Sequence, residues 1–229
     1  MPAPPTVRIL PSLLSADFTR LAEEIRRVEE GGADALHVDV MDGHFVPNLT
    51  IGLPVVESIR KTAKRPLDVH IMISNPLEYA ARYVEAGASG LTFHVEATRE
   101  PERVIDAIVE AGGRAAMAVN PETPVEPLLP YVDRLSMILV MSVHPGFGGQ
   151  KFMPEVLPKL ERLRAAGFGG DLEIDGGIGP STISEAARAG ANVFVAGSAI
   201  FGAPDVPARI AELRRLAEAA SGVATAARR

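Results

Sequence analysis

The chain has 229 residues, of which 47% are hydrophobic and 23% are charged, and its formal net charge is −6. This composition is ordinary for a globular protein, and the acidic balance argues against nucleic acid or an anionic membrane as a partner, whereas a small phosphorylated ligand needs only a local site. The chain has no cysteine, which excludes disulfides, thiolate metal sites and cysteine nucleophiles.

The N-terminal stretch MPAPPTVRIL lacks the basic and apolar regions of a signal peptide, and no apolar run approaches the ~18 residues of a membrane span. We therefore expect a soluble, cytoplasmic protein. A first strand is predicted near residues 7–13. The segment that follows, SLLSADF, is no glycine-rich dinucleotide turn, and the helical pattern after it has Asp17 or Ser15 as its N-cap.

The same unit then recurs along the chain: an amphipathic segment ends at a glycine, and a short apolar run follows. Five glycines are placed to end helices in the left-handed conformation: Gly31, Gly87, Gly112, Gly167 and Gly190. The apolar runs are typical of buried strands. With the first one, strands are predicted near residues 7–13, 35–41, 67–73, 90–96, 114–119, 136–143, 171–175 and 193–197. A further helix opens after Pro180, and the last helix covers about 205–220.

Eight strand–helix units with no linker between them predict one closed parallel barrel, the α/β fold known as the (β/α)8 or TIM barrel. We expect residues 1–229 to form a single barrel domain, with a frayed tail over about 221–229. The alternative is a doubly wound open sheet, which would have fewer strands and a glycine-rich turn after the first one.

Polar residues interrupt three of the apolar strands with the period of two that marks one face of a strand. In a barrel the apolar face packs against the helices, so the other face points inward, where charges are costly unless they are paired or coordinated. Four inward groups fall near the carboxyl ends of their strands, where barrel active sites are built: His37, Asp39, His70 and Asp175. Two imidazoles and two carboxylates suit a divalent zinc, iron(II), manganese or cobalt ion. The alternative interpretation is a set of hydrogen-bonded core residues.

Four other polar residues of the predicted strands are weaker candidates. Asp68 lies deeper in its strand than His70, and we expect it to be structural. Glu173 is interpreted as an ion-pair partner in the core, and His94 and Glu96 as supporting or structural residues.

The stretch LHVDVMDGHFVPN contains a second, mirrored pair, Asp42 and His44, next to His37 and Asp39. Strand alternation places Asp42 and His44 past the end of the strand, in a loop over the barrel mouth. We expect them to order this loop, to cover the substrate or to join a subunit contact.

Glycine clusters follow the last three predicted strands, in HPGFGGQKF, DGGIGPST and AGSAIFG. Glycines allow backbone amides to approach an anion closely, and the last loops of such barrels commonly bind phosphate. The predicted phosphate contacts are Gly146, Gly148, Gly149, Gly177, Gly197 and Ser198. The alternative is that these glycines only make tight turns.

Four motifs, LHVDVMDGHFVPN, VHIMI-NP, SVxPGFGGQ-F and DGGI, follow one another in an order and spacing that resembles the ribulose-phosphate 3-epimerase family. The resemblance runs from about Ile9 to Phe201. It implies a barrel of the ribulose-phosphate-binding type with one bound divalent metal ion. It also implies an isomerase that interconverts D-ribulose 5-phosphate and D-xylulose 5-phosphate in the pentose phosphate pathway or the Calvin cycle, and a homo-oligomer.

On this resemblance the metal ligands fall on the same four residues, and Asp39 and Asp175 form the acid/base pair. Epimerisation at C3 removes a proton on one face and returns one on the other, through an enediolate, so it needs two such groups. The substrate contacts expected from the glycine loops and the resemblance together are Ser12, His70, Met41, Met72, Met141, Gly146, Phe147, Gly148, Gly149, Gly176, Gly177, Gly197 and Ser198. Where the family leads us to expect Asn, the chain has His144, which we expect to tune binding.

Three alternatives stay open. A 3-epimerase of a six-carbon ketose phosphate, such as D-allulose 6-phosphate, would carry the same residues, because discrimination by chain length lies in pocket size. Related barrel lyases use Asp-x-Lys-x-x-Asp on the second strand, where this chain has Met41 in place of the lysine. A non-catalytic sugar-phosphate binder would be expected to lack an aspartate or a ligand, and none is missing.

Overall fold

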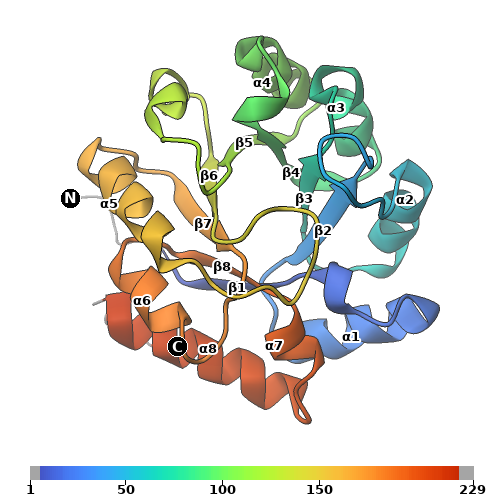
Figure 1. Cartoon of the computed structure of the whole chain (residues 1–229). Helices are drawn as coiled ribbons and strands as arrows, with labels where there is room; N and C mark the ends of the chain where they lie inside the picture. Colours follow the sequence, from blue (N-terminus) through green and yellow to red (C-terminus); the bar gives the residue numbers. More distant parts are fainter. Residues whose placement is uncertain (1–5, 222–229) are drawn as a thin grey trace.

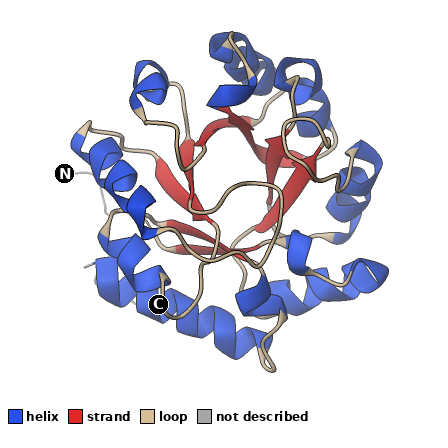
Figure 2. Ribbon diagram, in the orientation of Figure 1, coloured by secondary structure: helices blue, strands red, loops and turns tan. Residues whose placement is uncertain are grey.

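The computed structural model describes residues 6–221; the tail predicted to fray lies almost wholly in residues 222–229, outside this part. Eight parallel strands surround a central axis and helices surround the strands (Figures 1 and 2), which confirms the predicted (β/α)8 barrel. The strands are β1 Arg8–Pro11, β2 Leu36–Met41, β3 Leu67–Met72, β4 Ala88–His94, β5 Arg114–Val119, β6 Met137–Met141, β7 Asp171–Asp175 and β8 Val193–Ala196. They hydrogen-bond in the order β1-β8-β7-β6-β5-β4-β3-β2.

The helices alternate with these strands along the chain. The α-helices are α1 Leu21–Glu30, α2 Leu53–Thr62, α3 Pro76–Glu85, α4 Pro101–Glu110, α5 Leu157–Ala165, α6 Ile183–Arg188, α7 Ser198–Phe201 and α8 Val206–Ser221. Short 3₁₀ helices add η1 Leu13–Ser15, η2 Phe18–Arg20, η3 Val95–Ala97, η4 Glu126–Tyr131 and η5 Pro154–Val156. The connection between β5 and β6 carries only η4, because four prolines in residues 121–130 remove the backbone donors that an α-helix needs.

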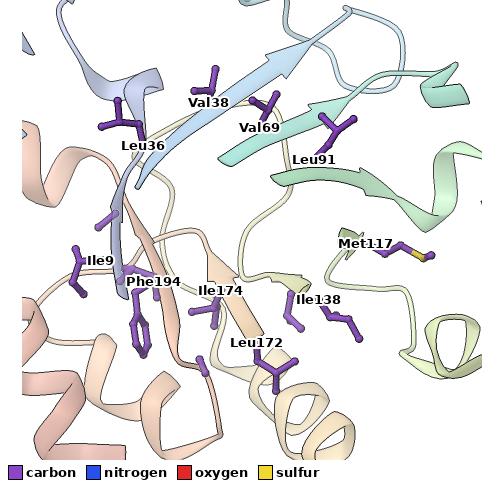
Figure 3. Packing of buried hydrophobic residues seen from close by; sticks show 14 of the residues in the cluster. Ile9, Leu36, Val38, Val69, Leu91, Met117, Ile138, Leu172, Ile174 and Phe194 are labelled. Atoms are coloured by element: carbon purple, nitrogen blue, oxygen red, sulfur yellow. The ribbon is translucent and has the colours of Figure 1, made fainter. Parts of the chain in front are cut away.

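The outward faces of the strands make the main hydrophobic core. Figure 3 shows these side chains projecting from neighbouring strands toward the helices. The labelled members are Ile9, Leu36, Val38, Val69, Leu91, Met117, Ile138, Leu172, Ile174 and Phe194, and all are fully buried. Each such side chain contributes about 1.5–3 kcal/mol by its burial, so this layer fixes which face of every strand points inward.

Closure of the barrel brings the first two strands together. Ser12, directly after β1, forms a parallel bridge with His37 of β2. The Asp34 amide donates to the Ile9 carbonyl at 3.1 Å, and the Asp34 carboxylate accepts from the Ile9 amide at 2.8 Å. This contact places the 3₁₀ helix η1 beside the inward residues of β2.

Two local details differ from the sequence-based prediction. Gly31 ends α1 with φ −71°, and the next residue, Gly32, has the left-handed φ of 94°, so the prediction for Gly31 is wrong by one position. A Gly-Gly pair satisfies either arrangement, and only packing decides between them. The other four helix-ending glycines are confirmed. Asp17 caps the short η2, accepting from the Thr19 amide, and α1 begins only at Leu21.

Strand register brings the inward polar residues together. Asp39 of β2 lies opposite His70 of β3, and Met41 lies opposite Met72 at the end of the same pair of strands. On the other side, Met141 of β6 lies opposite Asp175 of β7.

In residues 6–221, no helix is both long and apolar enough to cross a membrane.

Candidate active site

The four predicted ligands converge at the carboxyl ends of β2, β3 and β7. One nitrogen or oxygen of each of His37, Asp39, His70 and Asp175 lies within 4.8 Å of the corresponding atoms of the others. Three of the side chains are buried, and Asp175 is partly exposed to the cavity above. Residues from three separate strands therefore form one compact cluster.

Asp39 is the centre of this cluster. Its Oδ1 lies 3.3 Å from His37 Nε2 and 3.3 Å from His70 Nδ1, and its Oδ2 accepts a 2.7 Å hydrogen bond from the Ser12 hydroxyl. Burial raises the pKa of Asp39, but the two histidines outweigh burial and hold this pKa well below its usual range. Asp39 is thus an ionised acceptor at neutral pH.

His37 is anchored from behind by a carboxylate. Its Nδ1 lies 2.7 Å from Asp68 Oδ2, and the imidazole is fully buried. Burial lowers the pKa of His37, but Asp39 and Asp68 together raise it well above its ordinary value. Asp68, which was expected to be structural, therefore orients His37 within the cluster.

Glu173 lies beneath the cluster and has no exposed atom. Its carboxyl lies 3.7 Å from His37 Nδ1, and neither oxygen has a hydrogen-bond donor among the described residues. Burial first, and the neighbouring charge of Asp68 second, raise the pKa of Glu173 well above its usual range. A neutral Glu173 donating its proton toward Asp68 satisfies both groups.

His70 is supported by a longer chain of polar groups. His70 Nε2 lies 2.8 Å from His94 Nε2, and His94 Nδ1 lies 3.2 Å from Glu96 Oε2. The other oxygen of Glu96 accepts from the Asn120 amide at 2.8 Å. Burial lowers the pKa of His70, and burial also lowers the pKa of His94, to about 4. Burial raises the pKa of Glu96, but its hydrogen bonds lower this pKa to about 2.

Asp175 joins the cluster from the end of β7. Burial, and then repulsion by Asp39, raise the pKa of Asp175 to about 7. The two aspartates therefore occupy contrasting environments within one site. A cation between them would relieve their mutual repulsion.

The donor set fits a divalent metal ion. His37 Nε2 and His70 Nδ1 are buried and have no hydrogen-bond partner among the described residues, and both face Asp39 Oδ1. Such orphaned nitrogens are rare unless a ligand or ion satisfies them. Two imidazole nitrogens with carboxylate oxygens are a donor set that zinc, iron(II), manganese and cobalt accept.

A cavity of about 310 Å³ opens above the cluster. It is lined by the two aspartates and by most of the predicted substrate contacts, namely Ser12, Met41, Met72, Met141, Gly146, Phe147, Gly148, Gly149, Gly176, Gly177, Gly197 and Ser198. Among the described residues, His37 and His70 are outside this lining. The three methionine side chains are buried and give the cavity an apolar wall beside the carboxylates.

Backbone conformation explains two of the cavity glycines. Gly177 has φ +64°, and a Cβ at this position would lie 2.5 Å from the Phe152 amide nitrogen. Gly197 precedes the short α7, and a Cβ there would collide with the Ser15 hydroxyl. Larger residues are thus excluded where the two loops approach each other and the cavity.

Two long loops meet over the mouth of the barrel. The loop between β6 and α5 crosses the opening and reaches toward β2 (Figures 1 and 2). There Asn48 donates from Nδ2 to the Gly146 carbonyl at 2.6 Å, and on the crossing loop Gln150 donates to the His144 and Phe147 carbonyls. The cavity is therefore roofed by backbone of the crossing loop.

Asp42 orders the loop between β2 and α2, as one of its predicted roles required. Its oxygens accept from the His44, Phe45 and Ser74 amides, each at 2.8 Å. Burial raises the pKa of Asp42, but these backbone hydrogen bonds lower it to about 2. Asp42 and His44 lie outside the cluster and outside the cavity lining within the described chain.

His144 also lies outside that lining in the described structure. Its exposed side chain points to Glu122, with Nδ1 3.2 Å from Glu122 Oε1. The cavity lining contains residues that sequence reasoning missed, including Leu14, Ser15 and Gln150. These residues are uncharged and belong to no periodic sequence pattern. Leu14 and Ser15 reach the cavity because they follow the Ser12–His37 bridge, and Gln150 because it lies on the crossing loop.

Comparison with known proteins gives one consistent family. The profile described as "Ribulose-phosphate 3 epimerase family" matches residues 8–201. A ribulose-phosphate 3-epimerase of Mycobacterium tuberculosis is 55% identical over 217 residues, which cover 93% of this chain and 94% of that protein. The cytoplasmic isoform of Oryza sativa subsp. japonica is 50% identical, covering 95% and 97%, and the enzyme of Bacillus subtilis is 46% identical, covering 91% and 98%.

Solved structures show the fold alone. KGPDC from Streptococcus mutans superposes with a TM-score of 0.72 at 15% identity, covering 93% of this chain and 98% of that one. A tryptophan synthase structure from Mycobacterium tuberculosis superposes with a TM-score of 0.67 at 19% identity, covering 93% of each chain. These proteins share the barrel architecture with the present chain.

Proposed function

The chain belongs to the ribulose-phosphate 3-epimerase family and is an isomerase, and on this premise we propose that it interconverts D-ribulose 5-phosphate and D-xylulose 5-phosphate. The observation that carries the proposal is the pair Asp39 and Asp175, held on different strands within one ligand-sized cavity. Inversion at a carbon next to a ketone requires proton removal on one face and proton delivery on the other. We propose that the carboxyl groups of Asp39 and Asp175, which line the same cavity, supply one proton transfer each.

The surroundings of each aspartate suit this task. The Ser12 hydroxyl and the two imidazoles hold Asp39 in one orientation, while the carbonyl of Asp175 is fixed by the Ser142 hydroxyl at 2.9 Å. Met41, Met72 and Met141 place apolar side chains in the cavity wall beside the two carboxyl groups. Apolar surroundings strengthen electrostatic interactions with a reacting carbon.

We further propose that His37, Asp39, His70 and Asp175 hold one divalent ion, zinc, iron(II), manganese or cobalt. When bound, such an ion supplies Lewis acidity that stabilises negative charge developing on neighbouring oxygens. The fit of the residues supports this role, since two buried imidazole nitrogens face the same carboxylate oxygen without a partner of their own.

The proposed phosphate site is the glycine-rich side of the cavity. Gly146, Gly148, Gly149, Gly176, Gly177, Gly197 and Ser198 line it with backbone, and Phe147 adds an exposed ring at its rim. Backbone amides of such loops bind phosphate without needing a net positive protein. With the phosphate fixed there, the reacting end of the sugar lies toward the two aspartates.

The location, pathway and assembly are also proposals. A cytoplasmic location agrees with the printed name of the Oryza sativa relative, and a role in the pentose phosphate pathway or the Calvin cycle follows from the proposed substrates. A homo-oligomer is proposed from the family alone.

A coupled assay of purified enzyme tests the substrate. We expect kcat/KM for D-ribulose 5-phosphate to exceed that for D-allulose 6-phosphate by at least about tenfold, because one extra CHOH unit must fit between the two aspartates and the phosphate site. A preference for the six-carbon sugar would replace the proposed substrate with the alternative one. Turnover of neither sugar would contradict the proposed reaction.

A further inference from the structure

Behind the proposed ligand His70 of β3, His94 of β4 and Glu96 of η3 continue a chain of polar groups to which the proposed reaction assigns no role. It runs from His70 through His94 to Glu96 and ends at the Asn120 amide, with separations of 2.8, 3.2 and 2.8 Å. His70 and His94 are both fully buried. The register of the strands explains the contact, since His70 lies opposite Thr92 and His94 is the next inward residue of β4.

The end of this chain determines the proton positions along it. Glu96 accepts from the Asn120 amide through one oxygen, and its low pKa keeps it ionised, so its other oxygen also acts as an acceptor. His94 therefore carries its proton on Nδ1 and turns a lone pair on Nε2 toward His70. A hydrogen bond at 2.8 Å between the two Nε2 atoms then requires His70 to be the donor.

The consequence falls on the other nitrogen of His70. With its proton on Nε2, a neutral His70 presents a lone pair at Nδ1, and this is the atom that lies 3.3 Å from Asp39 and has no hydrogen-bond partner in the described structure. The reverse arrangement would place a lone pair of His94 against the Glu96 carboxylate.

We propose that His94, oriented by Glu96, is a positioning residue that fixes the tautomer of His70 and thereby prepares its Nδ1 to bind a divalent cation. This inference rests on the proposed metal site but adds two residues that do not belong to the ligand set. Partners that orient ligand histidines typically change metal affinity by about 10–100-fold when removed. His94 would act on binding of the ion through His70 and not by touching substrate.

The experiment uses the full chain stripped of metal and two variants of the same position. His94→Gln keeps an acceptor near the former Nε2, whereas His94→Phe keeps a buried ring and loses the acceptor. Phe45→Leu is the matched control, because Phe45 packs on the His94 ring with centroids 4.8 Å apart and makes no hydrogen bond in this chain of polar groups. Affinity for Zn²⁺ is measured by competition with a chromogenic chelator.

We expect His94→Phe to bind Zn²⁺ about 10–100-fold more weakly than the unmodified chain, and both His94→Gln and Phe45→Leu to remain within about threefold. Unchanged affinity in His94→Phe would overturn the proposal, and so would an equal loss in Phe45→Leu. If His94→Phe fails to fold, Glu96→Gln serves in its place, since it weakens the end of the chain at a partly exposed residue.

Nitrogen-15 spectra of the histidines in metal-free protein test the tautomer without any metal. The proposal requires His70 to be protonated on Nε2 and unprotonated on Nδ1, and the opposite assignment would overturn it. This readout separates the two proposals: a chain that binds no Zn²⁺ but shows this tautomer contradicts the metal site alone.

Discussion

The two sides of the barrel mouth are built by different means. On the side of β2 and β3, strand side chains form the site: His37, Asp39 and His70 project inward from positions that register alone determines. On the side of the loops after β6, β7 and β8, backbone forms it, and glycines allow the chain to approach the cavity. The first side is charged and buried, and the second, apart from Asp175 at the end of β7, is uncharged and more open.

The difference separates two tasks of a sugar-phosphate epimerase. Proton transfer needs carboxyl groups fixed to within a fraction of an ångström, which rigid strands provide. Binding a phosphate needs several weak donors on a curved surface, which glycine loops provide. Substitutions on the strand side should therefore lower kcat, and substitutions on the loop side should mainly raise KM.

Removal of the metal should have the largest effect. We expect exhaustive chelation to abolish activity and added Zn²⁺, Mn²⁺ or Co²⁺ to restore it, because the ion that the four proposed ligands would hold supplies the Lewis acidity for the reaction. Full activity in protein shown by elemental analysis to be free of metal would contradict the proposal that the reaction needs a metal ion at this site.

The loop side is tested by Gly177→Ala. A side chain at φ +64° costs about 1–2 kcal/mol, and its Cβ would also push against the Phe152 amide at 2.5 Å. We expect KM for the phosphorylated substrate to rise about tenfold, with a smaller change in kcat, in steady-state assays. The matched control is Gly112→Ala, which has φ +90° far from the cavity and no atom within 4 Å of its Cβ. Gly112→Ala should lower thermal stability without changing KM. An equal rise in KM in both variants would contradict a specific role of the Gly177 loop in binding.

Acid should lower the stability that Asp42 contributes to the loop between β2 and α2. The folded-state pKa of Asp42 is lowered to about 2 from an ordinary 3.8, so its contribution to stability is complete above about pH 4 and is lost as the pH falls toward 2. We expect Asp42→Asn to lower the melting temperature by a few degrees at pH 7, with the difference from the unmodified chain shrinking below pH 4. A difference that grew on acidification would contradict this account.

The smallest effect is expected at His144. Its side chain is exposed and pairs with Glu122 at the surface, where an ion pair contributes little. His144→Asn should change KM by less than about threefold and leave kcat unaltered. A tenfold change would mean that this position contacts the substrate when the crossing loop closes.

The architecture was predictable because every strand repeats the same pattern. Alternation within β2, β3 and β7 identifies the inward face without any tertiary information, so the convergence of His37, Asp39, His70 and Asp175 follows once eight strands close into a barrel. Prediction from the sequence fails where two adjacent residues of the same type could take the same position. Gly31 and Gly32 are equivalent in sequence, and packing alone selects Gly32 for the left-handed position.

Contacts between distant loops could not be predicted. Asn48 and Gly146 are 98 residues apart, and neither belongs to a periodic pattern that would indicate their hydrogen bond. Ser15 reaches the cavity because η1 comes right after β1 where the barrel closes, and the sequence alone does not indicate this position. The pairing of His94 with His70 likewise depends on the register shift between β3 and β4 at Leu67 and Asp68.

The central claim is that Asp39 and Asp175 act on opposite faces of C3. The direct measurement is C3–H exchange in D₂O, followed by NMR for each epimer separately, with Asp39→Asn and Asp175→Asn variants of verified metal content. We expect each variant to lose interconversion by about 10²–10⁴-fold, and Asp175→Asn to exchange the C3 hydrogen of one epimer only, while Asp39→Asn exchanges that of the other. Interconversion at a near-normal rate in either variant, or loss of the same epimer's exchange in both, would contradict the two-carboxylate mechanism.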